Sequence, residues 1–109
     1  IFITADESAA CEAYKEAVLN SDETSTELTR AFSGRWARGI RNAFMERMKS
    51  AGIPIPYYTY QNGLTAPLRA YGQAHNLVDW ISLWAGQSAF RSKRGKSKEI
   101  FLSLVQSLQ

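Results

Sequence analysis

The sequence predicts a mixed α/β fold with a single hydrophobic core. The chain has 109 residues, and 45% of them are hydrophobic, which suffices for one small domain. Four segments carry apolar residues at helical spacing, and short extended segments lie between them. The single cysteine, Cys11, excludes an intrachain disulfide and a multi-cysteine metal site, and it fits a reducing cytoplasm.

The amino-terminal residues predict a strand end followed by a helix. Residues 1–4 are typical of the end of a buried strand, and because no initiator methionine or polar lead-in precedes them, we expect the chain to be a fragment. Thr4 and Glu7 have the spacing of a capping box, so a helix should begin at once. Its predicted buried stripe is Ala10, Ala13, Tyr14, Ala17 and Val18, while Glu12, Lys15 and Glu16 face water.

The middle of the chain predicts a strand and a second helix. The β-branched stretch 24–32 favours a strand that leads to a turn at Gly34. Helical spacing resumes after Gly39, and Gly52 followed by Pro54 ends that helix. Two prolines then hold the next residues in extended conformation. The apolar side of the helix consists of Ile40, Ala43, Phe44, Met48 and Ala51.

Two further helices are predicted in the second half of the chain. Residues 57–61 should be extended, and Asn62-Gly63 is a turn dipeptide ahead of a third helix that has Pro67 in its first turn. Residues 80–84 form an apolar run that fits either a strand or a packed loop. Ser97 is a suitable N-cap for the last helix. The apolar sides are Leu64, Leu68, Tyr71 and Ala74 in the third helix and Ile100, Phe101, Leu104, Val105 and Leu108 in the last.

Charge is divided unevenly along the chain. Residues 1–28 contain seven acidic residues against Lys15 alone, whereas the remainder contains twelve basic residues against three acidic ones, so two surfaces of opposite sign are expected. The basic run 91–98 raises a nucleic-acid alternative. The aromatic residues are not adjacent to that run and no nucleic-acid motif is visible, which favours a solvated connector. No apolar run approaches the ~20 residues that cross a bilayer, so no membrane partner is expected.

Few residues could carry chemistry. His75 has no nucleophile motif around it, and Cys11 lies among small apolar residues, so both are interpreted as structural. The arginines at 35, 38 and 41 could hold a phosphate or carboxylate, or could be solvated and bond backbone carbonyls. Two turn segments, 61–62 and 85–88, carry amide and hydroxyl groups that could contact a polar ligand head or could serve the turns alone.

Three segments line up in order with one known family. They are Phe2-Ile3-Thr4-Ala5-Asp6-Glu7-Ser8, then Leu28-Thr29-Arg30-Ala31-Phe32-Ser33-Gly34-Arg35-Trp36-Ala37-Arg38-Gly39, and then Gln61-Asn62-Gly63-Leu64-Thr65 with Ser82-Leu83-Trp84-Ala85-Gly86-Gln87. Together they resemble the C-terminal third of the nitronate monooxygenases, once called 2-nitropropane dioxygenases. Trp36 departs from the proline of the family pattern, and no functional group is lost by that change.

The resemblance implies the C-terminal portion of a flavin-binding TIM (β/α)8 barrel with an inserted α+β cap domain and flavin mononucleotide (FMN) as cofactor. On this mapping, residues 1–19 are the last barrel strand end and its helix, and residues 20–90 are the cap. Residues 91–109 are then a basic connector and a helix that packs on the barrel. The glycine-rich segment that grips the flavin phosphate and the histidine base would both precede Ile1, so the resemblance implies no catalytic residue in this chain.

The implied reaction is oxidation of an alkyl nitronate by the flavin, which then meets dioxygen to give a carbonyl compound and nitrite. The resemblance leads us to expect Gly86, Gln87 and Ser88 at the flavin, and Gln61, Asn62 and Trp84 on the substrate side. The fragment alone should be inactive. Two alternatives remain: an NAD(P)H:quinone reductase or enoyl-thioester reductase on the same scaffold, and a stand-alone noncatalytic binding module.

Overall fold

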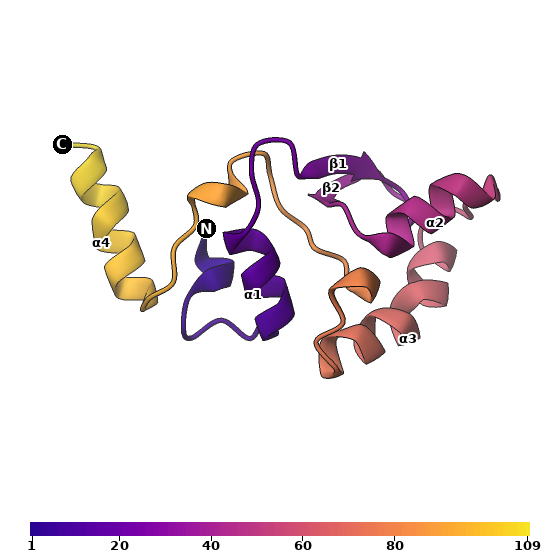
Figure 1. Cartoon of the computed structure of the whole chain (residues 1–109), viewed down its shortest axis with the longest axis horizontal. Coiled ribbons are helices and arrows are strands. Elements are labelled where there is room, and N and C mark those ends of the chain that lie inside the picture. Colours follow the sequence, from indigo (N-terminus) through magenta and orange to yellow (C-terminus); the bar gives the residue numbers. More distant parts are fainter.

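Four α-helices and one β-hairpin make up the computed structural model, which describes all 109 residues (Figure 1). In chain order the elements are the 3-10 turn η1 (Phe2–Thr4), α1 (Glu12–Leu19), β1 (Thr26–Thr29), β2 (Ala37–Ile40), α2 (Ala43–Ala51), α3 (Tyr60–Ala74), the 3-10 turns η2 (Val78–Trp80) and η3 (Ala89–Arg91), and α4 (Ser97–Ser107). The body is elongated, with extents of 49 × 26 × 23 Å. The predicted mixture of helices and strands is confirmed.

The β-hairpin lies in the right-hand half of Figure 1, beside α2 and α3. β1 falls within the predicted strand 24–32 and pairs antiparallel with β2. No strand is predicted for residues 37–40, because Ala-Arg-Gly has little intrinsic preference for extended structure. The other side of β2 receives the segment 83–85, since the Ile40 N–H donates to the Leu83 carbonyl at 2.9 Å and the Ala85 N–H to the Arg38 carbonyl at 3.2 Å. The apolar run 80–84 forms no strand: it begins with the last residue of η2 and makes a single isolated bridge from Trp84 to Gly39, so it is a packed loop.

Two glycines are required by this arrangement. Gly34 has a φ of 88°, and a Cβ there would lie 2.6 Å from the Tyr58 amide nitrogen, so the predicted turn at this position is confirmed and only glycine fits it. Gly39 lies where β2 meets the segment 83–85, and a Cβ there would be 3.0 Å from the Leu83 carbonyl oxygen. A side chain at position 39 would therefore push that segment away from the hairpin.

The core consists of two small clusters where a single core is predicted. Val18, Ile40, Ile81 and Leu83 form one cluster, which joins α1 to β2. Ala31, Phe32 and Met45 form the other, between the hairpin and α2. Trp84 packs against the second cluster and Ala85 against the first, so one short segment links the two.

The amino-terminal residues differ from the prediction. Residues 2–4 form η1 rather than a strand end, and α1 begins only at Glu12. The predicted capping box is wrong. Thr4 Oγ1 donates to the Lys93 carbonyl at 2.8 Å, and Glu7 Oε2 accepts from the Ser97 N–H at 2.9 Å. Both side chains bond to residues about 90 positions away, which local spacing does not reveal.

α1 presents its predicted stripe to the core, with one exception. Val18 is 3% exposed, and Tyr14 and Ala17 are half-buried. Lys15 is predicted to face water, but it is 5% exposed, and its Nζ donates to the Ala5 carbonyl at 2.9 Å. The long methylene stem of lysine can lie in apolar surroundings while the ammonium reaches a polar atom.

α3 also differs from the prediction in its start and in its buried side. The helix begins at Tyr60, so the predicted Asn62-Gly63 turn lies inside it, and Pro67 is in the helix interior. The predicted apolar stripe faces outward, with Leu64 70% exposed. The buried side instead carries Gln61, Thr65 and Gly72. Two of these polar side chains donate to the backbone carbonyls of Ala31 and Phe32, which explains why they are tolerated inside.

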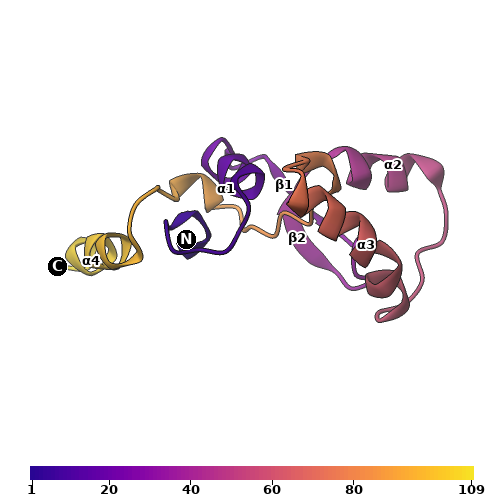
Figure 2. The same ribbon diagram turned by 90° about the horizontal axis from the view of Figure 1, so that it is seen from below.

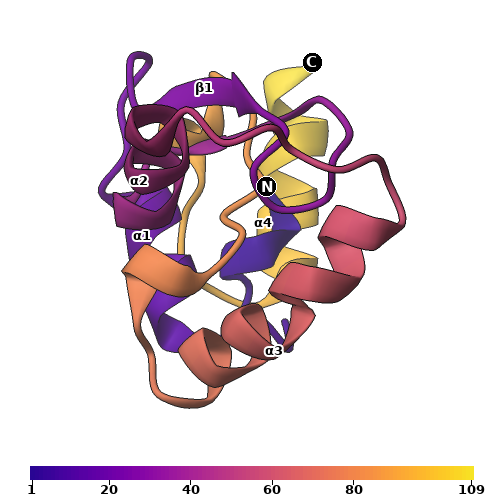
Figure 3. The same cartoon turned by 90° about the vertical axis from the view of Figure 1, so that its right-hand side faces the viewer.

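α2 and α4 have nearly the predicted limits. In α2, the Asn42 side chain accepts from the Met45 N–H at 3.3 Å, and Gly52 ends the helix in the left-handed conformation. In α4, Ser97 is predicted as the N-cap but is the first helical residue, and the N-cap is Lys96. α4 lies apart from the other helices in Figures 1 and 2, and Figure 3 looks along the long axis with α3 in front of it. No helix is both long and apolar enough to cross a bilayer.

Candidate functional site

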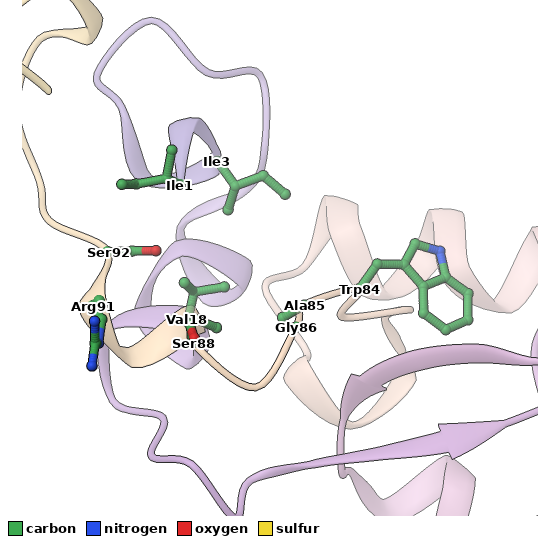
Figure 4. A pocket seen from close by; sticks show the side chains of 10 residues that line it. Ile1, Ile3, Val18, Trp84, Ala85, Gly86, Ser88, Arg91 and Ser92 are labelled. Atoms are coloured by element: carbon green, nitrogen blue, oxygen red, sulfur yellow. The ribbon is translucent and has the colours of Figure 1, made fainter. Parts of the chain in front are cut away.

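A pocket of about 390 Å³ lies between the amino-terminal residues and the segment 84–92 (Figure 4). Six of its ten lining residues are hydrophobic. The lining residues are Ile1, Ile3, Val18, Trp84, Ala85, Gly86, Ser88, Ala89, Arg91 and Ser92. The pocket is thus a mostly apolar wall with a few polar groups, as is typical of a small-molecule site.

Figure 4 shows two sides of this pocket facing one another. Ile1 and Ile3 lie on one side, and Val18 and Ser88 lie on the opposite side. Ser92 points its hydroxyl between them. The hydroxyls of Ser88 and Ser92 form no hydrogen bond within the chain, so both are free to bind a ligand.

The structure brings three of the predicted site residues into this pocket. Trp84, Gly86 and Ser88 line it, whereas the side chain of Gln87 is exposed beside it and does not. Arg91 and Ser92 are polar lining residues absent from the prediction. Their closeness in sequence to Ser88 is the signal that points to them, because residues 88–92 form one turn around η3.

Trp84 is held in place from three directions. The Tyr14 hydroxyl donates to the Trp84 carbonyl at 2.6 Å, and the Phe32 ring meets the indole edge-on at 5.7 Å between centroids. Gly39 supports the backbone from the β2 side through an isolated antiparallel bridge. Burial raises the pKa of Tyr14 to about 12, so this phenol keeps its proton and its hydrogen bond at neutral pH.

Gln61 and Asn62 lie on α3 and do not line the pocket. Gln61 is 4% exposed, and its Nε2 donates to the Ala31 carbonyl at 2.6 Å. Asn62 accepts hydrogen bonds from the Arg69 guanidinium at its side-chain oxygen and at its carbonyl, at 2.9 Å and 2.8 Å. Both amides therefore already hold the start of α3, and Gln61 Oε1 and Asn62 Nδ2 are the atoms without a bonding partner in the chain.

The three arginines between residues 35 and 41 do not converge on one ligand. Arg38 donates to the Thr26 carbonyl and hydroxyl, both at 3.2 Å. Arg35 lies over the Tyr58 ring, 4.7 Å from its centroid, and Arg41 is exposed. The interpretation as turn arginines that bond backbone and ring faces is therefore the better one, and these residues form no anion site.

His75 and Cys11 have structural surroundings. His75 follows the last residue of α3, is exposed, and stacks on Tyr71 with 4.2 Å between ring centroids. Cys11 is half-buried at the N-cap of α1. No group of three or more potential metal ligands occurs in the structure.

The basic connector, residues 91–96, is partly neutralised by the acidic amino-terminal residues. Arg94 forms an ion pair with Glu12 at 2.8 Å. The hydrogen bond from Arg94 lowers the pKa of Glu12, and the hydrogen bond from the Ser97 N–H lowers the pKa of Glu7. The two regions of opposite charge that the composition predicts thus meet beside the pocket.

The chemistry of the pocket fits a partly apolar ligand that carries polar or anionic groups. A Cβ added at Gly86 would meet nothing within 4 Å, so the backbone there leaves room for close approach by a ring. Ser88, Ser92 and the Arg91 guanidinium supply hydrogen-bond donors that form no hydrogen bond or ion pair within the chain.

Known proteins match this chain over almost its whole length. A family model described as nitronate monooxygenase matches residues 1–107. A probable nitronate monooxygenase of Staphylococcus haemolyticus (strain JCSC1435) is 45% identical over 87 residues, which cover 80% of this chain and 24% of the relative. A probable nitronate monooxygenase of Staphylococcus aureus (strain Newman) is 42% identical over the same shares. The chain therefore spans about a quarter of the length of these curated relatives.

Solved structures agree with this match. A nitroalkane oxidase from Streptomyces ansochromogenes superposes with a TM-score of 0.86 at 30% identity, over 96% of this chain and 30% of that one. A point mutant of FabK from Thermotoga maritima superposes with a TM-score of 0.71 at 17% identity, over 97% of this chain and 31% of that one, and this likeness concerns the fold alone. With a family model covering residues 1–107, the chain belongs to the nitronate monooxygenase family.

Proposed function

We propose that this chain is the C-terminal part of a flavin-dependent oxidoreductase that oxidises alkyl nitronates with dioxygen to a carbonyl compound and nitrite. Family membership over residues 1–107 is the observation that carries the proposal. The apolar pocket with unpaired hydroxyls at Ser88 and Ser92 supports it, because a flavin and a small substrate need such a wall. The flavin supplies the electron transfer, and the cofactor we assign is FMN.

The surfaces of the chain support a larger protein around it. We assign residues 1–19 to the last barrel strand end and its helix, residues 20–90 to a cap, and residues 91–109 to a connector and a helix that packs on the barrel. The apolar side of α4 is consistent with this assignment, because Phe101 and Val105 on the helix and Leu108 at its C-cap are exposed in this chain. An amphipathic helix with its apolar side in water gains little stability, and a barrel surface would cover that side. The cytoplasmic location that we propose rests on the single cysteine, which suits a reducing compartment.

Within this pocket we assign each residue a role in binding. The open backbone at Gly86 would admit the flavin ring, and the Ser88 hydroxyl would donate a hydrogen bond to the flavin. Gln87 lies beside the pocket and would contact the flavin or substrate at the rim. Trp84 forms the apolar wall on the substrate side.

Gln61 and Asn62 support the substrate side from α3. Their contacts to substrate would use Gln61 Oε1 and Asn62 Nδ2, because their other polar atoms bond within the chain. The catalytic base lies outside this chain.

The decisive experiment uses the full-length protein. We expect it to be yellow when purified, to release FMN on denaturation, and to consume dioxygen and form nitrite when given an alkyl nitronate. Parallel assays with NADH plus a quinone and with an enoyl thioester test the reductase alternatives. If this chain alone carries no flavin colour and unfolds cooperatively, the stand-alone binding module is the better interpretation.

The Gln87 assignment has its own test. Replacing Gln87 with alanine in the full-length protein should raise the KM for nitronate or weaken FMN binding, because one polar contact at the rim is lost. Gln106→Ala is the matched control, since Gln106 is an exposed glutamine on α4. Unchanged nitronate turnover and FMN affinity in Gln87→Ala would remove this residue from the site.

A further inference from the structure

Lys15 is the single charged side chain among the buried residues of the chain. It is 5% exposed, and its Nζ lies 2.9 Å from the Ala5 carbonyl oxygen. No carboxylate lies within the 4.0 Å of Nζ that would make an ion pair. Removing an ammonium from water is costly, and the hydrogen bond to the Ala5 carbonyl offsets part of that cost, so the Lys15 side chain and Ala5 are fixed to each other.

The carbonyl that Lys15 binds belongs to a junction of three segments. Ala5 is 2% exposed and forms an isolated parallel bridge with Gly95 of the basic connector. The next residue, Asp6, donates its N–H to the Gly95 carbonyl at 2.9 Å, and the preceding residue, Thr4, bonds the Lys93 carbonyl. Residues 4–6 are therefore fixed between α1 on one side and the connector on the other.

The same segments provide the two sides of the pocket. Ile1 and Ile3 immediately precede this junction, while Arg91 and Ser92 begin the connector that is bonded to it. Figure 4 shows Ile1 and Ile3 opposite Ser88. The spacing between the sides thus depends on where Ala5 is held. Without the hydrogen bond from Lys15, the amino-terminal side keeps only its apolar packing on α1, through Ile3, and loses the hydrogen bond that fixes Ala5.

We propose that Lys15 is a positioning residue for the pocket: its ammonium holds the Ala5 carbonyl so that Ile1 and Ile3 stay at the correct distance from Ser88. The inference rests on the proposed function, because it takes FMN as the molecule that the pocket helps to bind. Lys15 acts through Ala5 and touches neither cofactor nor substrate.

The test measures FMN affinity in the full-length flavoprotein after its flavin has been removed. Lys15→Met keeps the apolar stem and removes the donor, and FMN titration followed by flavin fluorescence should show a weakening on the order of tenfold. Lys15→Arg, which keeps a charged donor, should restore most of the affinity. Thr65→Val is the matched control, because it removes another buried donor to a backbone carbonyl, that of Phe32, away from the pocket.

Each result has a defined meaning. Equal FMN affinity in Lys15→Met and wild type overturns the inference, and so does an equal loss in Thr65→Val, which would indicate general destabilisation. If Lys15→Met does not fold, Thr4→Val decides, since it removes one of the hydrogen bonds that fix the same junction to the connector without removing a charge. Unchanged affinity in Thr4→Val would then overturn the inference. A wild-type protein that binds no FMN contradicts the proposed function itself.

Discussion

The two helices nearest the ends of the chain, α1 and α4, have similar amphipathic sequences and different surroundings. In α1, Val18 is 3% exposed and packs against Ile40, Ile81 and Leu83. In α4, only Ile100 is buried, while Phe101 is 56% exposed and Leu108, which follows the last helical residue, is 87% exposed. An amphipathic pattern therefore specifies a helix and its apolar side, but it does not specify what that side packs against.

The attachment of α4 is confined to its first turn. Glu7 accepts a hydrogen bond from the Ser97 N–H, and Ile100 is the one side chain of the helix that is buried. α1, by contrast, contacts η1, η2 and η3 along its length. The difference predicts that substitutions in α1 disturb the whole chain, whereas substitutions in α4 disturb only the helix itself.

The largest expected difference in stability comes from placing a charge on the apolar side of α1 and on that of α4. Val18→Asp buries an unpaired carboxylate in the core and should lower the free energy of unfolding by about 4 kcal/mol or more. Leu108→Asp alters a side chain that is 87% exposed, so its effect should stay within about 0.5 kcal/mol. Urea denaturation of this chain followed by circular dichroism measures both. Similar losses in the two variants would contradict the comparison.

A smaller loss of stability is expected for Phe101→Ala, and it should differ between this chain and the full-length protein. Phe101 is 56% exposed in this chain, so Phe101→Ala should cost below about 1 kcal/mol here. In the full-length protein, where we propose that a barrel covers α4, the same substitution should cost about 3 kcal/mol, because a packed aromatic side chain leaves a cavity. Thermal unfolding of both proteins makes the comparison. An equal cost in both would show that α4 stays uncovered.

A local effect is expected at the first turn of α4. Glu7→Gln removes a charged acceptor from the Ser97 N–H, and a neutral amide oxygen is a weaker partner for a helix N-terminus. Amide hydrogen exchange should therefore become severalfold faster in the first turn of α4, with no change in α1. Faster exchange in both helices would contradict a local role for Glu7.

The smallest effect is a dependence of stability on acid. Glu7 and Glu12 have pKa values lowered from the ordinary 4.5 by hydrogen bonds from the Ser97 N–H and from Arg94. A pKa that is lower in the folded state means that the stabilisation is present above pH 4.5 and is lost as the pH falls through the lowered values. Both carboxylates are exposed, so the effect is small and the Arg94 pair weakens in salt.

The measurement compares wild type with the double variant Glu7→Gln and Glu12→Gln between neutral and acidic pH. The difference in stability between them should shrink as the pH is lowered. Asp22 also has a lowered pKa, because of hydrogen bonds from Thr24, and both proteins retain it, so its contribution cancels. A constant difference at all pH values would contradict the assignment.

The parts of the fold that local signals control are the ones predicted from the sequence. Gly52 ends α2, Gly34 forms its turn, and β1 lies in the β-branched stretch. The start of α3 is missed, because the Asn62-Gly63 dipeptide has a local preference for a turn, whereas tertiary hydrogen bonds at Gln61 and Thr65 favour the helix. β2 is missed for a related reason, since its partners on both sides define it as a strand.

The candidate site shows the same division. Trp84, Gly86 and Ser88 lie in one short segment, and in the structure they line one pocket. Ile1, Ile3 and Val18 complete the pocket from a distant part of the sequence, and no spacing pattern relates them to Ser88. Their assignment requires the pairing of the amino-terminal residues with the basic connector.

The sequence by itself determined that four helices form, the limits of α2 and most of α4, and the family to which the chain belongs, because helical spacing, terminating glycines and motifs are properties of neighbouring residues. Only the tertiary structure decided which apolar sides are covered, that Lys15 is buried, and that Glu7 caps a helix 90 residues away. Those features depend on contacts between distant segments. Such contacts are favourable only when the whole chain brings the partners together, so no local pattern encodes them.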